Sequence, residues 1–293
     1  PRAAAGDRLD VFFAPAYSGP PLPCPTVLTI HDVSYFAHPE WFRVREGMKR
    51  RWLTRRAARH ARVVITVSEF SRDEIVTWLG LPASRVEVIV HGADAAEAFE
   101  AGAVDHTRPA PRTRDTVLYV GSIFNRRHVP DLIHAFAPIA REHPTAALEL
   151  VGDNRSFPFE DLRAIIERVN LPGQVTWRRY VGDQELARLY REARAFAFLS
   201  EYEGFGLTPL EALAAGVPPV LLDTRVARET CGAAALYVPP RNLTATTTAL
   251  RQLLFDEGVR HRIDSEAPAV LDRYHWRAAA TRTLDVIERV ALG

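Results

Sequence analysis

The chain has 293 residues, of which 47% are hydrophobic and 25% are charged, and its formal net charge is +1. That length suffices for two domains with sizeable cores, and a balance this close to zero excludes a global attraction to nucleic acid. No apolar run reaches the roughly 18 residues of a membrane span. Cys24 and Cys231 are isolated, lack metal-ligand spacing and fit a reducing compartment, and the start does not resemble a signal peptide. We therefore expect a cytoplasmic protein.

The first part of the chain alternates apolar strand patterns with helical ones. Strands are expected at 10–14, 27–30, 63–67 and 86–90. Ser68 is expected to cap a helix that begins at Glu69. His31 and Asp32 follow the second strand, and the carboxyl end of a parallel strand is where open α/β sheets bind ligands. His31 is thus a candidate to hydrogen-bond a substrate; the alternative is a histidine satisfied by Asp32.

A strongly basic helix is predicted over residues 43–62, which begin at Arg43 and end at Arg62. Its apolar stripe is expected to consist of Met48, Trp52, Leu53 and Ala57. The cations that flank this stripe are Arg50, Arg51, Arg55, Arg56 and Arg59. One interpretation is a solvated helix face. The other is an interfacial patch that contacts anionic lipid, or a pyrophosphate-linked acceptor, at the inner face of a membrane.

A second strand–helix series begins at Thr116, after an irregular stretch over 95–115 that we interpret as an interdomain connection. Its strands are expected at 117–120, 147–151, 175–177, 195–199, 220–222 and 235–238. Its helices are expected at 131–142, 159–169, 243–255, 258–271 and 276–290, with a further helix after Thr208. This alternation predicts an α/β fold with parallel sheets in both halves.

Two arginines follow the first strand of this series. The strand ends at Gly121, and the loop after it carries Arg126 and Arg127. Two guanidinium groups at a strand end can neutralise a diphosphate. The alternative is a pair of exposed loop arginines.

The stretch over 195–219 combines a buried strand, a loop with Gly204 and Gly206, and a helix. We expect Thr208 to cap this helix, with Pro209 in its first turn. Free N–H groups and the positive end of the helix dipole make such a helix start an anion site, for which phosphate is the usual ligand.

Two carboxylates, Glu203 and Glu211, flank this anion site. Because carboxylates repel phosphates, we expect both to accept hydrogen bonds from sugar or ribose hydroxyls. The alternative is structural: Glu211 completes a capping box with Thr208, and Glu203 is solvated.

These residues carry a family resemblance. Glu203, seven intervening residues and Glu211, within EGFGLTPLEALAAGVPPV, resemble the E-x7-E pattern of retaining glycosyltransferases of family 4. Further blocks resemble that family in the family's order: HDVSYFAHPEWF, VVITVSEFSRDEI, VIVHGAD, VLYVGSIFNRRH and YVGDQELARLYREARAF. His91 stands where the family often has asparagine, and Arg127 where it usually has lysine.

The resemblance implies the GT-B fold, in which two Rossmann-like domains face each other across a cleft. It places an acceptor-side domain at 1–100, a nucleotide-sugar donor domain at 115–274 and a helix at 275–293 that crosses back to the first domain. Family members open with a glycine-rich strand–loop–helix unit. No such unit opens this chain, so we expect the first domain to be incomplete.

The resemblance also implies a role for each site residue. Glu211 would accept bonds from ribose, Glu203 from the transferred sugar, and His31 would lie beside that sugar. The catalytic set is His31, Glu203, Arg126 and Arg127. The donor-binding set is Gly121, Arg126, Arg127, Val181, Glu203, Gly204, Phe205, Gly206, Leu207, Thr208 and Glu211. In this set the N–H groups near Phe205, Gly206 and Leu207 bind the diphosphate, and the backbone at Val181 lies against the base.

The predicted activity is transfer of a hexosyl group, with mannosyl favoured, from a nucleotide diphosphate sugar with retention of configuration. The acceptor would be a glycan, a lipid-linked molecule or a small molecule. We expect no cofactor and no metal, since the sequence has no Asp-x-Asp pair and no His/Cys ligand cluster. The alternative is a nucleotide-sugar-binding protein without turnover. A Rossmann oxidoreductase is disfavoured because the glycines open no early βαβ unit.

Overall fold

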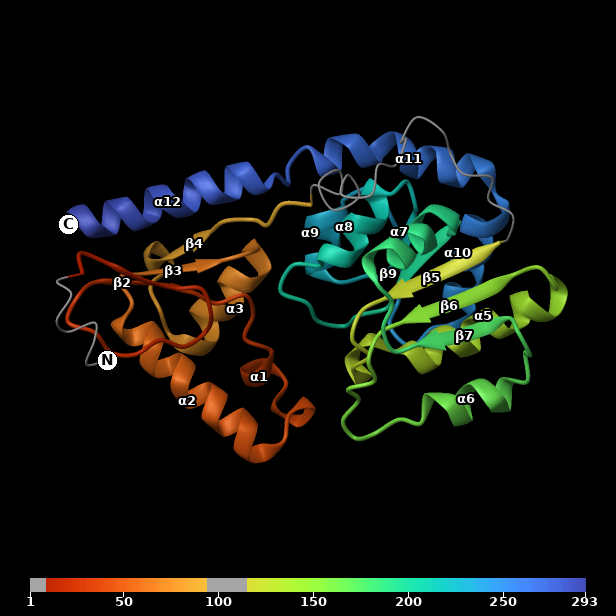
Figure 1. Ribbon diagram of the computed structural model, residues 1–293, viewed down its shortest axis with the longest axis horizontal. Helices are drawn as coiled ribbons and strands as arrows, with labels where there is room; N and C mark the ends of the chain where they lie inside the picture. The colour runs from red at the N-terminus through yellow and green to blue at the C-terminus, as the bar shows by residue number, and fades with distance from the viewer. Residues whose placement is uncertain (1–8, 94–114) are drawn as a thin grey trace. The chain divides into compact units, whose positions relative to one another are not determined.

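The computed structural model describes residues 9–93 and 115–293 (Figure 1). The connection expected over 95–115 falls outside the described residues except for Asp115. The chain divides into two compact units. The first unit comprises Pro1–Gly92, Glu203–Phe205 and Tyr274–Gly293, and the second comprises Ala93–Tyr202 and Gly206–Arg273.

The first unit contains a four-stranded parallel sheet in the order β1-β2-β3-β4. Its strands are β1 (Phe12–Ala14), β2 (Thr26–Thr29), β3 (Val63–Thr66) and β4 (Val86–Val88). Val27 pairs with Val63, and Leu28 pairs with Val64. Apolar and β-branched residues on these strands are buried on both faces, as a parallel sheet requires.

Helices cover both faces of this sheet. They are α1 (Ser34–Ala37), η1 (Pro39–Trp41), α2 (Val44–His60), α3 (Glu69–Leu79), η2 (Ala83–Arg85) and α12 (Trp276–Leu292). On one face Leu28 packs with Ala58 of α2 and Ile75 of α3. On the other face Val27 packs with Val286 of α12.

Helix α2 buries a different face from the one that its apolar pattern predicted. Its buried residues are Gly47, Thr54, Ala57 and Ala58, and the Thr54 hydroxyl lies 2.8 Å from the Tyr35 hydroxyl. Met48 and Trp52 are 59% and 58% exposed. The expectation that they continue one apolar stripe with Ala57 is wrong, because small residues let α2 approach its neighbours closely and leave the large side chains outside.

The second unit contains a six-stranded parallel sheet in the order β10-β9-β8-β5-β6-β7. Its strands are β5 (Thr116–Val120), β6 (Ala147–Val151), β7 (Val175–Arg178), β8 (Ala195–Phe198), β9 (Pro219–Leu222) and β10 (Leu236–Val238). The chain runs outward from β5 to β7 and then returns to the other side of β5 at β8. The strand order therefore reverses between β5 and β8, which makes this point the topological switch point of the sheet.

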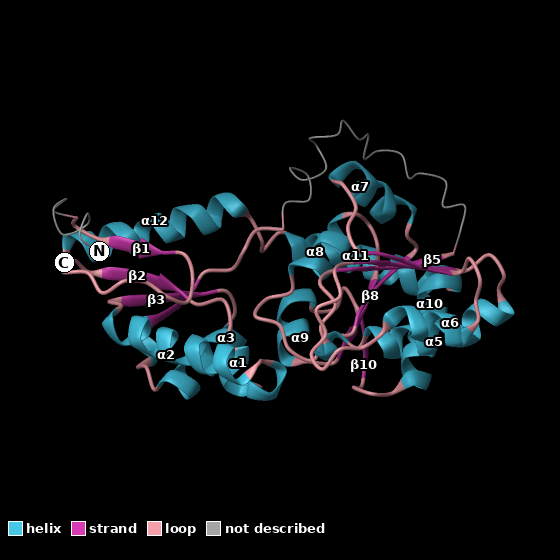
Figure 2. Cartoon of the chain, turned by 60° about the horizontal axis from the view of Figure 1, so that its bottom comes forward, coloured by secondary structure: helices cyan, strands magenta, loops and turns pink. Residues whose placement is uncertain are grey.

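Helices lie on both faces of the second sheet, with α7 on one face and α5 and α6 on the other (Figure 2). The helical elements are η3 (Asn125–Arg127), α5 (Val129–Glu142), α6 (Leu162–Val169), α7 (Asp183–Glu192), α8 (Leu207–Ala214), α9 (Arg225–Cys231), α10 (Leu243–Phe255) and α11 (Glu257–Leu271). Tyr119, Phe136 and Phe196 are fully buried between these layers. The predicted α/β class with parallel sheets in both halves is confirmed. In the described part of the chain, no helix is both long enough and apolar enough to span a membrane.

Candidate functional site

The loop that follows β5 brings Gly121 and Arg127 together. Gly121 has a φ of 144°, and a Cβ at this position would lie 2.8 Å from the Arg127 Nη1 atom. The same Nη1 atom donates a 2.8 Å hydrogen bond to the Ser122 carbonyl. The Arg127 guanidinium also lies 4.8 Å from the ring centre of Phe198, the last residue of β8. Arg127 therefore spans the ends of the two strands that form the switch point.

Arg126 lies in the same loop and helps to join it to the loop after β8. Its guanidinium is 4.3 Å from the ring centre of Phe124, a cation–π distance. Its carbonyl accepts a 2.9 Å bond from the Glu201 N–H. The ring of His128 lies 2.8 Å from the Glu201 carboxylate and 3.3 Å from that of Asp131. Neither His128 nor Glu201 was among the residues predicted for the site, although the FNRRH block contains the histidine.

The helix after the glycine loop begins at Leu207, two residues earlier than a cap at Thr208 implies. Gly206 is the N-cap of α8, with a φ of 100° that glycine adopts readily, and a glycine has no side chain with which to cap the helix. The prediction that Thr208 is the cap of this helix is wrong, because the left-handed Gly206 leads directly into a first turn that already contains Thr208. Thr208 and Glu211 consequently form no capping box. The backbone N–H groups of the first turn are left to the loop, solvent or a ligand.

Glu211 faces a tyrosine instead of the helix start. The Tyr190 hydroxyl donates a 3.4 Å bond to the Glu211 Oε2 atom. Burial raises the pKa of the Glu211 carboxyl, and the bond from Tyr190 offsets part of that rise. A half-buried carboxylate with spare lone pairs is suited to accept hydrogen bonds from a ligand's hydroxyl groups.

A second group of predicted residues lies in the first unit, around Gly204. The Gly204 carbonyl accepts bonds from the Ser68 and Ser71 hydroxyls at 2.6 and 3.0 Å. A Cβ on Gly204 would lie 2.4 Å from the His31 carbonyl oxygen, so only glycine fits against this backbone. Ser68 also caps α3 as predicted, since its hydroxyl accepts the Ser71 N–H at 3.0 Å. The structure thus brings His31 close to the segment that carries Glu203.

Phe205 is held within an aromatic group of the first unit. Its ring meets the His91 and Tyr274 rings edge-on, with centroids 5.5 and 5.3 Å apart. His91 also lies 5.3 Å from the His31 ring and 5.4 Å from the Trp276 ring. Burial, followed by the neighbouring His31, lowers the pKa of His91 to about 4, so its ring is neutral at pH 7. No site role was predicted for Ser68, Ser71, Tyr274 or Trp276, because no local pattern predicts contacts between such distant segments.

The predicted residues therefore form two groups. Gly121, Arg126 and Arg127 lie at the switch point of the second unit, which also contains Gly206, Leu207, Thr208 and Glu211 in and before α8. His31, Glu203, Gly204 and Phe205 belong to the first unit. Val181 follows β7, which β6 separates from β5. Among residues 9–93 and 115–293, no cluster of three or more His, Cys, Asp or Glu side chains is arranged to hold a metal ion.

Two Rossmann-like units, each built on a parallel sheet, are the architecture of the GT-B glycosyltransferases. The chain belongs to the glycosyl transferases group 1 family, whose model matches residues 105–270. A second model, glycosyltransferase family 4, matches residues 4–97.

Individual relatives agree with this assignment. The chain is 28% identical over 265 residues to O-antigen chain mannosyltransferase B of Escherichia coli, covering 88% of this chain and 69% of the relative. It is 29% identical over 274 residues to a glycogen synthase of Mycobacterium tuberculosis, covering 89% of this chain and 62% of the relative. A solved structure of Anabaena HepE in complex with UDP and glucose matches the fold with a TM-score of 0.71 at 21% identity, covering 90% of this chain and 72% of that one.

Proposed function

We propose that this chain transfers a hexosyl group, with mannosyl favoured, from a nucleotide diphosphate sugar to an acceptor hydroxyl with retention of anomeric configuration. The observation that carries this proposal is the switch point of the second unit. There Arg127 spans the ends of β5 and β8, and the loop after β8 leads into the start of α8, whose N-cap is a glycine. The name of the Escherichia coli relative, a mannosyltransferase, supports the choice of sugar.

The chemistry requires stabilisation of a departing diphosphate. Arg126, Arg127 and the N–H groups at the start of α8 would bind its developing negative charge, which is commonly a large contribution to catalysis. Glu211 would accept bonds from the ribose, Glu203 from the sugar, and the backbone at Val181 would lie against the base. Because these cations and the helix dipole supply the positive charge, the proposed step needs no metal and no further cofactor.

Retention follows from attack on the same face from which the phosphate leaves. The bond between the anomeric carbon and the phosphate oxygen breaks, the acceptor oxygen bonds to that carbon, and the acceptor's proton passes to the leaving phosphate. In this scheme His31 lies beside the transferred sugar. The acceptor would be a glycan, a lipid-linked molecule or a small molecule. A glycan is favoured because the E. coli relative is named an O-antigen chain mannosyltransferase. The reaction would take place in the cytoplasm, where the two free cysteines would stay reduced.

Calorimetric titration with UDP, GDP, ADP and their sugar conjugates, with and without EDTA, tests the donor site. We expect one nucleotide to bind selectively and without sensitivity to EDTA, which would name the base. Glu211→Ala should weaken donor binding, with Glu211→Gln as the isosteric control that retains one acceptor oxygen. Glu203→Ala should lower turnover more than nucleotide affinity.

Two outcomes would count against the proposal. If both glutamate variants kept full activity, the site assignment would be wrong. Selective nucleotide binding without transfer to any acceptor would favour a binding protein that has no turnover.

A further inference from the structure

The exposed face of α2 carries an apolar stripe that the described residues of its own unit leave uncovered. Val44, Met48 and Trp52 are spaced four residues apart, which places them on one side of the helix. They are 74%, 59% and 58% exposed. The residues that α2 buries are small or polar instead, whereas these three large apolar side chains face solvent. A helix that serves only as a solvated surface would carry its polar residues on this side.

Cations surround this stripe. Between Val44 and His60 the sequence has six arginines and Lys49 against one carboxylate, Glu46, a net charge of +6. The whole chain sums to +1, so all the remaining residues together sum to −5. Glu46 is itself engaged by Arg50 at 2.6 Å. This helix therefore carries a strong net positive charge, whereas the rest of the chain is net negative.

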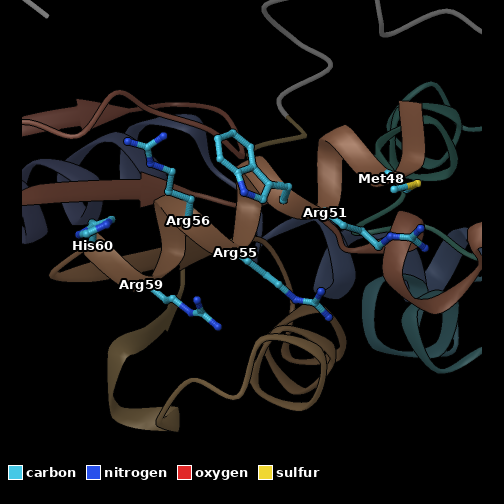
Figure 3. A pocket seen from close by; sticks show the side chains of 7 residues that line it. Met48, Arg51, Arg55, Arg56, Arg59 and His60 are labelled. Carbon is cyan, nitrogen blue, oxygen red and sulfur yellow. The ribbon is translucent and has the colours of Figure 1, made fainter. Parts of the chain in front are cut away.

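The cations and the apolar side chains share one shallow hollow of about 420 Å³. Figure 3 shows the labelled side chains projecting from α2. The residues that line it are Met48, Arg51, Trp52, Arg55, Arg56, Arg59 and His60. The Arg56 guanidinium lies 5.4 Å from the Trp52 ring centre, which keeps a cation directly beside the exposed indole.

We propose that this face of α2 docks on an anionic lipid bilayer. Arginines would contact headgroup phosphates while Val44, Met48 and Trp52 enter the boundary between headgroups and acyl chains, where tryptophan is favoured. The long exposed apolar stripe favours a lipid bilayer over a soluble phosphate as the ligand, because a soluble phosphate has no apolar part that could cover the stripe. Every lining residue comes from one helix, which suits a flat surface better than an enclosed small molecule. This proposal does not depend on the proposed transfer chemistry.

Vesicle co-sedimentation tests the proposal. Wild-type protein is incubated with phosphatidylcholine vesicles and with vesicles in which about a third of the lipid is phosphatidylglycerol. We expect at least tenfold stronger binding to the anionic vesicles. The Arg55→Glu/Arg59→Glu variant should lose most of this preference, and Trp52→Ser should weaken binding severalfold at unchanged charge.

The matched control is Arg163→Glu/Arg168→Glu on α6, which makes the same charge change at two exposed positions of the second unit. It should bind anionic vesicles like wild type, apart from a small effect of total charge. Circular dichroism spectra and thermal unfolding of all variants show that they remain folded, independently of any nucleotide site. Equal binding of wild type to neutral and anionic vesicles would overturn the proposal, as would an equal loss in the α6 control. Binding of inorganic pyrophosphate or duplex DNA by this face, without vesicle binding, would also overturn it.

Discussion

Helices α8 and α2 are both amphipathic by sequence, yet they use their apolar residues in opposite ways. In α8 the apolar positions Leu210 and Leu213 are 0% and 4% exposed, and the proposed diphosphate site lies at the helix start. In α2 the largest apolar residues, Met48 and Trp52, lie outside, and the proposed lipid-binding surface is the helix flank. Helical periodicity therefore identifies a helix, but which apolar side chains meet the core depends on the available neighbours.

The surroundings of the two helices explain the difference. Helix α8 connects β8 to β9, two adjacent strands whose residues are all buried. Because the helix forms the crossover between these strands, its apolar side chains pack onto the sheet. Helix α2 instead packs through Ala57 and Ala58, whose small side chains allow close approach to the sheet of the first unit. A close approach of this kind leaves no room for a tryptophan between the layers.

The largest expected effect is on stability and concerns the buried apolar residues of α8. Leu210→Ala should lower the free energy of unfolding by about 2–5 kcal/mol, because it leaves a cavity at a fully buried position. Chemical denaturation followed by circular dichroism measures this change. A loss below about 1 kcal/mol would mean that α8 is not held by its apolar flank.

The next effect concerns the segment that carries Glu203. Ser71→Ala removes a hydroxyl that bonds the carbonyls of Gly204 and His31, both at 3.0 Å. One lost hydrogen bond is worth about 1 kcal/mol, so we expect turnover to fall about fivefold while nucleotide affinity stays unchanged. Steady-state kinetics with calorimetry separates the two quantities.

Ser265→Ala is the control for Ser71→Ala. It also removes a hydroxyl-to-carbonyl bond, of 2.7 Å, but on the exposed surface of α11. Turnover of this variant should match wild type. An equal fall in both variants would show that Ser71 has no positioning role.

A smaller effect concerns the histidine that packs against Phe205. The pKa of His91 is about 4 in the folded chain, against 6.5 for an unperturbed histidine. Between these values the unfolded chain binds more protons, so the free energy of unfolding falls as the pH drops from about 6.5 toward 4. His91→Asn should lessen this fall.

Denaturation at a series of pH values measures the effect of His91→Asn. His261→Asn, at an exposed position of α11, is the comparison variant and should follow the wild-type profile. If the two variants had the same pH profile, burial of His91 would contribute nothing to acid sensitivity.

The smallest effect on stability belongs to α2. Met48→Ser should change the free energy of unfolding by no more than about 0.5 kcal/mol, because the side chain is already 59% exposed. The same denaturation experiment measures it beside Leu210→Ala. A cost comparable to that of Leu210→Ala would abolish the distinction between the two helices.

The sequence by itself determined the alternation of strands and helices, the glycine loop before α8 and the arginine loop after β5. These features depend on local periodicity, on residues such as Gly206 that permit unusual backbone angles, and on the spacing of side chains along the chain. The α/β class and the family follow from them. The sequence also showed α2 to be basic and apolar at once, without showing which of its faces lies inside.

Only the tertiary structure decided which strands are neighbours. Because β8 returns to the side of β5, the loops with Arg127 and Gly206 belong to one switch point, although some 80 residues of chain separate them. Backbone geometry also made Gly206, not Thr208, the start of α8. The hydroxyls of Ser68 and Ser71 reach the Gly204 carbonyl across more than 130 positions. Contacts of this kind depend on how folded layers pack, and no local sequence pattern encodes them.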